Sequence, residues 1–182
     1  MEIQTTAIAG CFEIVPQVFE DNRGYFFESF NQEKFEKATG ATPFFVQDNQ
    51  SFSTKGVLRG LHFQEGAHAQ AKLVRVLNGE VLDVAVDIRP GSATYGAVVR
   101  TILSSDNRKQ LFIPRGCAHG FVTLSETATF FYKCDNFYNQ SSEGGILYND
   151  PAFKIDWIVP TSELIISEKD LALPTLKEFA AG

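Results

Sequence analysis

The sequence predicts an all-β fold, an antiparallel sandwich or barrel. Strand-like segments recur at short intervals between turn signals, which is typical of such folds. Seventeen Phe residues support this class, because aromatic side chains favour pleated, half-buried surfaces. A length of 182 residues and an apolar fraction of 44% suit one domain with one core, spanning 1–182. The predicted strands are 24–30, 44–53, 57–63, 72–77, 80–88, 96–103, 110–114, 120–124 and 127–134.

The segment Leu77-Asn78-Gly79-Glu80 is the strongest hairpin signal, because Asn-Gly accepts the positive φ of a type I′ turn. A two-residue turn would pair Val76 with Val81, Val74 with Asp83, and Lys72 with Ala85. Alternation then puts these six residues on one face. The mixture of small apolar residues with one Lys and one Asp fits two interpretations equally well: the inside of a binding cavity, or a solvated face with scattered charge. The other face is apolar and is expected to be buried between layers: Leu73, Leu77, Leu82, Val84, Val86 and Ile88.

Short helices are expected only at the periphery. Residues 31–39 fit a helix that Asn31 caps and Gly40 ends, with Phe30 and Phe35 at hydrophobic-staple positions. The tail after Ser162 mixes polar residues with Leu and Pro. It predicts turns and short helix lying over the barrel.

Composition excludes several classes of protein. A net charge of −6 argues against a nucleic-acid partner. No apolar run is long enough to span a membrane, and the N-terminus lacks the basic region of a signal peptide, so a cytoplasmic protein is expected. Cys11, Cys117 and Cys134 have no CxxC spacing and are interpreted as reduced, packed thiols.

Two of the three histidines are candidates for chemistry. Arg59 and His62 would face opposite ways on a regular strand, but a bulge at Gly60 would break that alternation. His119 directly follows a Pro-x-Gly turn. His68 lies in a polar loop and is interpreted as an ordinary surface residue.

At this point the chain resembles a known group of folds. The pattern Pro114-x-Gly116-x-x-His119 resembles half of the cupin signature, which implies a jelly-roll barrel with the site inside. Metal-binding cupins usually carry His-x-His and a Glu, whereas the counterpart here reads His62-Phe63-Gln64. Two imidazoles without a carboxylate partner make a poor metal site, so no metal and no other cofactor are expected.

A closer resemblance, to the dTDP-4-dehydrorhamnose 3,5-epimerase family, covers nearly the whole chain. Ala67 and Cys117 depart mildly from it. The matching segments, specific as an ordered set, are 19–28, 47–51, 56–64, 70–75, 84–89, 113–121, 132–135, Tyr138, 143–146 and 149–151.

The resemblance implies epimerisation at C3 and C5 of dTDP-4-dehydro-6-deoxy-D-glucose, as in dTDP-rhamnose biosynthesis. It assigns His62 as the base, Tyr132 as the opposite acid and Asp170 as the partner of His62, although Ser167 and Asp170 also have capping-box spacing. Lys72, which the face assignment reaches independently, is the candidate for holding the C4 oxygen. We further expect Asp83 to hold Lys72 in place.

The same resemblance implies a substrate shell and a homodimer. Arg23 and Arg59 would bind the diphosphate, and Phe26 and Tyr138 would stack on the base. The strand that carries Arg23, Phe26 and Glu28 is expected to reach the neighbouring subunit's site. The other implied contacts are Gln47, Asp48, Asn49, His119, Glu143 and Lys169.

Three alternatives stay open. A mono-epimerase acting at C3 or C5 alone would share the base, the lysine and the fold. A metal-dependent cupin is disfavoured by the missing His-x-His. A non-catalytic sugar-binding cupin is disfavoured by the presence of His62, Lys72, Tyr132 and Asp170 together.

Overall fold

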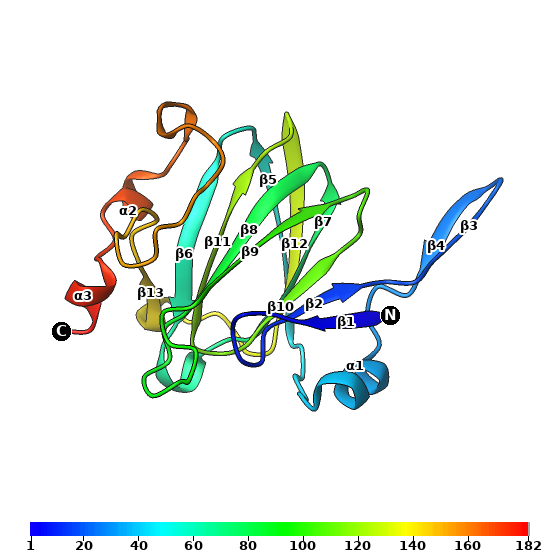
Figure 1. Ribbon diagram of the computed structural model, residues 1–182, viewed down its shortest axis with the longest axis horizontal. Helices are drawn as coiled ribbons and strands as arrows, with labels where there is room; N and C mark the ends of the chain where they lie inside the picture. Colours follow the sequence, from blue (N-terminus) through cyan, green and yellow to red (C-terminus); the bar gives the residue numbers. More distant parts are fainter. Residues whose placement is uncertain (182) are drawn as a thin grey trace.

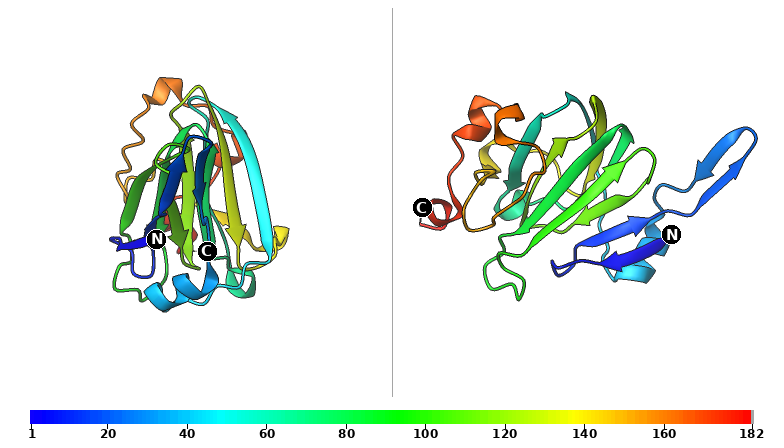
Figure 2. Two further views of the ribbon diagram at one scale, coloured as in Figure 1. Left: turned by 90° about the vertical axis from the view of Figure 1, so that its right-hand side faces the viewer. Right: turned by 45° about the horizontal axis from the view of Figure 1, so that its top comes forward.

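The computed structural model describes residues 1–181 and contains two antiparallel sheets that face each other (Figure 1; Figure 2). The six-stranded sheet has the order β1 (Glu2–Thr5), β2 (Phe12–Val15), β10 (Gln110–Ile113), β7 (Lys72–Asn78), β12 (Thr127–Cys134) and β5 (Gln47–Thr54). The five-stranded sheet has the order β13 (Glu143–Gly145), β6 (Leu58–Gln64), β11 (Cys117–Thr123), β8 (Glu80–Asp87) and β9 (Val98–Ser104). The predicted all-β class is confirmed.

A hairpin of β3 (Val18–Asp21) and β4 (Gly24–Phe27) forms a separate two-stranded arm that projects from the body (Figure 1). Its aromatic side chains are unusually exposed, with Phe26 at 69% and Tyr25 at 57%. The arm therefore presents an apolar surface to solvent.

The helices are short and peripheral: α1 (Gln32–Thr39), α2 (Glu168–Leu171), α3 (Leu176–Phe179) and the 3₁₀ turns η1 (Gly66–His68), η2 (Gln140–Ser142) and η3 (Thr161–Glu163). The predicted start and end of α1 are confirmed. The Asn31 side chain accepts from the Lys34 N–H at 3.0 Å, and Gly40 ends the helix at φ 71°. The rings of Phe30 and Phe35 lie 5.9 Å apart, as expected of a staple.

The predicted hairpin at Asn78-Gly79 is wrong. Strand β7 pairs with β10 and β12, whereas β8 pairs with β11 and β9, so the turn carries the chain from one sheet to the other. Gly79 has φ 83°, and a Cβ there would lie 2.1 Å from the Thr127 carbonyl oxygen, so only glycine fits.

The two predicted faces of residues 72–88 are largely confirmed, although the strands pair with other neighbours than expected. Val74, Val76, Val81 and Ala85 all belong to the central core between the sheets. The apolar face packs on the outer sides instead, with the exception of Leu77, which is 40% exposed. Alternation is a property of each strand alone, so it holds whichever strand is the neighbour.

The outer face of the five-stranded sheet is covered by the C-terminal segment (Figure 1). Phe153, Trp157, Leu176 and Phe179 pack there against β6, β8 and β11. The prediction that the tail lies over the barrel is therefore confirmed. A third cluster, including Phe35 and Phe112, lies under α1.

All the predicted strands are present, with ends that shift by up to three residues. Strand β11 begins at Cys117 rather than at residue 120, and β12 matches its predicted bounds. The strands that the pattern missed are β1, β2, β3 and β13, each of three or four residues. Segments this short carry too little alternation to be recognised.

The three cysteines are free and buried, as expected. Burial raises the pKa of Cys11 and of Cys117 to about 12, so both behave as packed apolar groups. Within residues 1–181, no helix combines the length and apolar character that crossing a membrane requires.

Candidate active site

One end of the space between the sheets is an open cavity of about 410 Å³. His62 and His119 reach it from the five-stranded sheet, and Lys72, Tyr132 and Asn49 reach it from the six-stranded sheet. An adjoining recess of about 270 Å³ shares His62, Lys72, Tyr132 and Asn49. The residues expected to form a base, an acid and an oxygen-holding cation therefore lie around one pocket.

A bulge in β6 brings Arg59 and His62 to the same cavity. His62 lies opposite His119 on β11, but Arg59 lies opposite Phe121, so the register shifts between them. Gly60 has φ 129°, and a Cβ there would be 2.6 Å from the Gly120 Cα. The predicted bulge at Gly60 is confirmed, and the close strand approach explains why the residue is glycine.

His62 is held by a buried acid from the C-terminal segment. Its Nε2 lies 2.7 Å from the Asp170 Oδ1, and Oδ2 of the same carboxylate accepts from the Gly60 N–H at 3.3 Å. The Asp170 N–H donates to the Ser167 Oγ at 3.1 Å, so Ser167 also caps α2. Ser167 therefore caps α2, and Asp170 of the same helix contacts His62.

Lys72 and Tyr132 lie side by side on the facing sheet, with the Lys72 Nζ 5.7 Å from the Tyr132 ring centroid. Burial lowers the pKa of Lys72, and the negative charges of Asp83 and Glu143 oppose that shift. Burial also raises the pKa of Tyr132, which keeps its phenol protonated at neutral pH.

The expected contact between Asp83 and Lys72 is wrong. Within residues 1–181, the only ion pair of Asp83 is with His119, whose Nε2 lies 2.9 Å from the Asp83 Oδ2. Asp83 is completely buried and lies behind His119 rather than on the cavity wall. The error follows from the hairpin, because the assumed register placed Asp83 and Lys72 on one two-stranded ribbon.

Aromatic rings that the sequence reasoning missed form part of the wall. Phe121 and Phe130 stack at 4.2 Å, and the His119 ring stacks on Phe130 at 6.0 Å. Phe121 follows His119 by two positions, and Phe130 precedes Tyr132 by two positions. Strand alternation would therefore have predicted that both rings face the cavity. Also missed were Gln50, Ser51, Phe63, Gln64, Gln70 and the lining role of Ser167.

Gln64 stands where metal cupins have their second histidine, and here it organises a loop instead. Its side chain donates to the His68 carbonyl at 2.7 Å and accepts from the Asn139 N–H at 2.7 Å. These bonds hold the segment that carries Tyr138 over the recess. Among residues 1–181, no three His, Cys, Asp or Glu side chains gather as a metal-ligand set.

The outer rim joins Tyr138, Glu143 and Lys169 in one polar cluster. The Glu143 carboxylate accepts from the Lys169 Nζ at 2.8 Å and from the Tyr138 hydroxyl at 3.3 Å. The hydrogen bond from Lys169 lowers the pKa of Glu143 and raises that of Lys169. The Gln47 side chain accepts from the Tyr138 N–H at 2.9 Å, so all four predicted rim residues meet.

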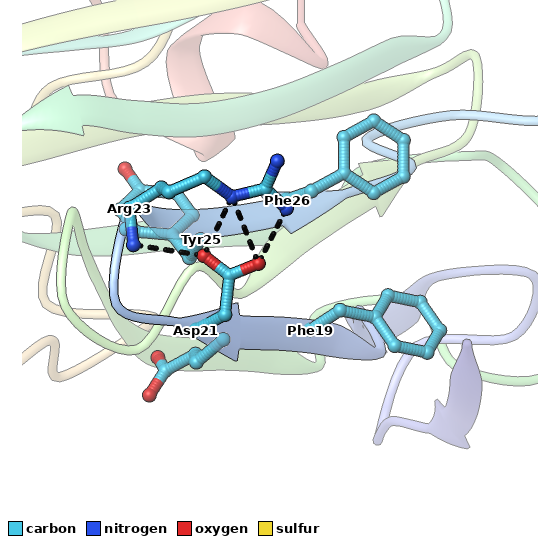
Figure 3. Close-up of a pocket in the computed structure, with 7 residues that line it drawn as sticks. Phe19, Asp21, Arg23, Tyr25 and Phe26 are labelled. Atoms are coloured by element: carbon cyan, nitrogen blue, oxygen red, sulfur yellow. Dashed lines mark hydrogen bonds and ion pairs between the residues drawn. The ribbon is translucent and has the colours of Figure 1, made fainter.

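Four residues of the expected substrate shell lie away from this cavity. Asp48 points to the outer side of β5 and pairs with Lys133 at 2.7 Å. Glu28 pairs with Lys34 near α1. Arg23 and Phe26 lie on the arm, where Arg23 hydrogen-bonds to Asp21 and Phe26 pairs with Phe19 across the two strands, and these residues line a separate pocket (Figure 3).

Comparison with known proteins identifies the family. The model of the dTDP-4-dehydrorhamnose 3,5-epimerase family matches residues 5–178. The chain belongs to this epimerase family. The dTDP-4-dehydrorhamnose 3,5-epimerase of Salmonella typhimurium is 55% identical over 179 residues, which cover 98% of this chain and 97% of that relative.

Solved epimerase structures agree. A dTDP-4-dehydrorhamnose 3,5-epimerase from Elizabethkingia anophelis matches with TM-score 0.95 and 54% identity, covering 98% of this chain and 97% of its own. The dTDP-6-deoxy-D-glucose-3,5-epimerase of Legionella pneumophila, solved with dTDP-4-keto-L-rhamnose, matches with TM-score 0.92 and 49% identity over 97% of this chain and 93% of its own. The expected family, cupin-type barrel and enzyme class, an isomerase, are confirmed.

Proposed function

We propose that this cavity inverts C3 and C5 of dTDP-4-dehydro-6-deoxy-D-glucose to give dTDP-4-dehydro-L-rhamnose, with His62 as base and Tyr132 as acid. One observation carries the assignment of roles. His62 belongs to one sheet and Tyr132 to the other, and both line the same cavity. A flat sugar ring between the sheets then has the base on one face and the acid on the other, which inversion requires.

The first half of each inversion is removal of a proton next to the ketone. Asp170 accepts a hydrogen bond at Nε2 of His62, which leaves Nδ1 as the basic nitrogen. Nδ1 takes the proton from carbon, and the electron pair of the broken C–H bond forms the C=C bond of an enolate. The carbonyl π electrons move onto the C4 oxygen, and the Asp170 carboxylate stabilises the imidazolium that forms.

Lys72 holds the negative oxygen of that enolate. Its ammonium group is partly buried in the cavity wall, where a fixed cation stabilises developing charge more strongly than water does. The enolate then collapses back to the ketone and takes a proton at carbon from the Tyr132 hydroxyl on the opposite face. Solvent reprotonates the phenolate and the imidazolium loses its proton, which restores both groups for the second carbon.

Arg59 and the polar rim suit the nucleotide end of the substrate. The Arg59 Nε donates to the Ser53 Oγ at 3.2 Å and a terminal nitrogen donates to the Phe52 carbonyl at 3.4 Å, so the guanidinium is already oriented beside the cavity. A fork held in this way can bind a diphosphate without further ordering cost. Tyr138, 56% exposed at the rim, offers a flat ring to the base.

The arm supports a homodimer with shared sites. Arg23 and Phe26 are exposed on a hairpin that projects from its own barrel, away from its own cavity (Figure 1; Figure 3). The exposed Arg23 guanidinium and the exposed Phe26 ring fit the diphosphate and the base, respectively, of a site on a second copy. Such an arrangement would complete the substrate shell in trans.

Mixed dimers test this arrangement. His62→Ala and Arg23→Ala should each be weakly active alone, whereas co-expressed chains should regain activity. The mixed dimer carries both defects in one site and neither in the other, so a random mixture should reach about a quarter of wild-type activity. No gain above the separate variants would show that the arm does not serve a neighbouring site.

Incubation of dTDP-4-keto-6-deoxyglucose with the enzyme in heavy water tests the reaction itself. Proton NMR should show deuterium entering at both C3 and C5, and His62→Ala should abolish exchange at both. Tyr132→Phe should lose inversion more than exchange, because proton removal still occurs on the His62 face. Deuterium at only one carbon would establish a mono-epimerase, and exchange that survives in His62→Ala would remove His62 as the base.

A further inference from the structure

A second His–Asp pair lies in the barrel, and the proposed proton transfers do not use it. His119 is 8% exposed and Asp83 is completely buried, with the His119 Nε2 2.9 Å from the Asp83 Oδ2. His119 lies directly opposite His62 in the pairing of β11 with β6. Two imidazoles on neighbouring strands, each bound at Nε2 by a carboxylate, therefore border one cavity.

The His119 ring is fixed on two sides. Asp83 holds its Nε2, and Phe130 stacks against its face with an interplanar angle of 24°. Phe130 is in turn stacked on Phe121 at 4.2 Å. Within residues 1–181, the other nitrogen, Nδ1, has no hydrogen-bond partner, although His119 lines the cavity.

Burial of Asp83 lowers the stability of the folded protein. Its Oδ1 is buried without a hydrogen-bond partner, so half of the carboxylate is desolvated without compensation. Asp87, the other fully buried acid of β8, shows the contrast. Its two oxygens accept from Arg89, Ser92 and Thr94, as an acid with a purely structural role would.

We propose that Asp83 is a positioning residue that fixes His119 as the Nε2–H tautomer, so that Nδ1 accepts a hydrogen bond from a sugar hydroxyl. This rests on the proposed function. An ionised carboxylate only accepts, so its partner nitrogen carries the hydrogen and the opposite nitrogen of the neutral ring keeps a lone pair. A hydroxyl can donate to that lone pair, whereas the C4 ketone would be repelled by it. His119 thus distinguishes the hydroxyl side of the sugar from the ketone side, and the ketone is directed toward Lys72.

Nitrogen-15 NMR of histidine-labelled enzyme, without substrate, tests the tautomer. The His119 signals should show a protonated Nε2 and an unprotonated Nδ1 at neutral pH. In Asp83→Asn the amide can donate to Nε2, so the population should shift toward the Nδ1–H tautomer. A wild-type ring protonated at Nδ1, alone or at both nitrogens, would overturn the proposal, and this measurement stands even if Asp83→Asn fails to fold.

Kinetics provide the second test, with substrate exchange in heavy water as the readout. Asp83→Asn should lower kcat/KM about ten- to hundredfold, the size expected when a hydrogen bond at a reacting substrate is replaced by a mismatch. His119→Phe keeps a ring against Phe130 and removes both nitrogens. Adding Asp83→Asn to it should cost no more than about a further twofold, because a residue that acts only through His119 has nothing left to act on.

Asp87→Asn is the matched control, since it also removes a fully buried carboxylate from β8. It should lower the unfolding temperature and leave kcat/KM within about twofold of wild type, as expected of an acid remote from the cavity. Losses from Asp83→Asn and His119→Phe that multiply in the double variant would refute the proposal. An inactive wild-type enzyme would instead refute the proposed function. The tautomer measurement needs no turnover, so the two failures can be distinguished.

Discussion

Replacing Asp170 by Asn should inactivate the enzyme by moving a proton to the wrong nitrogen of His62. The Gly60 N–H donates to the Asp170 Oδ2, so the oxygen of an Asn side chain would take that place. The amide nitrogen would then replace the Asp170 Oδ1, which lies 2.7 Å from the His62 Nε2. From that place the amide would donate a hydrogen bond to Nε2. His62 would carry its own hydrogen on Nδ1, the nitrogen that must accept the proton from carbon.

The magnitude follows from the geometry of the pair. Unit charges 2.7 Å apart at an effective dielectric constant of about 20 attract by about 6 kcal/mol. His62 is about one-third exposed, so solvent screening reduces the stabilisation of its imidazolium to about 3–5 kcal/mol. At about 1.4 kcal/mol per factor of ten, kcat should fall by about 10²–10⁴-fold.

The assay is the initial rate of deuterium entry at C3 and C5, followed by proton NMR. Circular dichroism and the unfolding temperature of Asp170→Asn should stay near wild type, because the Gly60 bond and the side-chain volume are retained. Glu126→Gln, which removes an acid that is 92% exposed, should leave the rate unchanged. A folded Asp170→Asn enzyme with more than a fifth of the wild-type kcat would refute the role given to this pair.

Other changes should act on stability or on stability and activity together. Lys72→Met should abolish measurable exchange yet raise the unfolding temperature in a thermal melt. Burial lowers the pKa of Lys72, so its charged form is destabilising at neutral pH. An unchanged exchange rate or a lower melting temperature would contradict this prediction. Hydrogen bonds outweigh burial and hold the pKa of Asp87 far below its usual range, so its stabilisation exists above about pH 4 and disappears as the pH falls through the folded value. Urea unfolding of Asp87→Asn should therefore show a loss of about 3 kcal/mol at pH 7 that shrinks below pH 4, and a constant loss would contradict the assignment. Gly60→Ala should destabilise by more than about 2 kcal/mol and reduce activity, whereas Gly40→Ala, with open space around its Cβ, should cost only about 1 kcal/mol; equal losses would count against the close approach at Gly60.

Local signals in the sequence were sufficient for α1 and for the longer strands, but not for β1, β2, β3 and β13, which have three or four residues each. The caps and staple of α1 were predicted because each involves residues within one turn of the helix start or end. The strands were predicted with small shifts in their ends, and the two faces of 72–88 were separated correctly apart from Leu77, because alternation follows from the pleat of a single strand. The bulge at Gly60 was predicted from parity alone.

The pairing of strands was decided only by the tertiary structure. Asn78-Gly79 has the chemistry of a hairpin turn, but β7 and β8 join different sheets, so Asp83 contacts His119 instead of Lys72. The tertiary structure also decided the position of the arm, whose residues lie away from the cavity of their own chain.

The sequence, read with its family resemblance, determined the family and the all-β fold and supplied the candidate residues for a base, an acid and a cation. The resemblance already gave Asp170 as the partner of His62, 108 residues away, but only the tertiary structure decided that Asp83 pairs with His119, 36 residues away, rather than with Lys72. Local geometry depends on φ, ψ and side-chain alternation within a few residues. Long-range partners depend on how the whole chain buries its apolar faces, and no short segment contains that information.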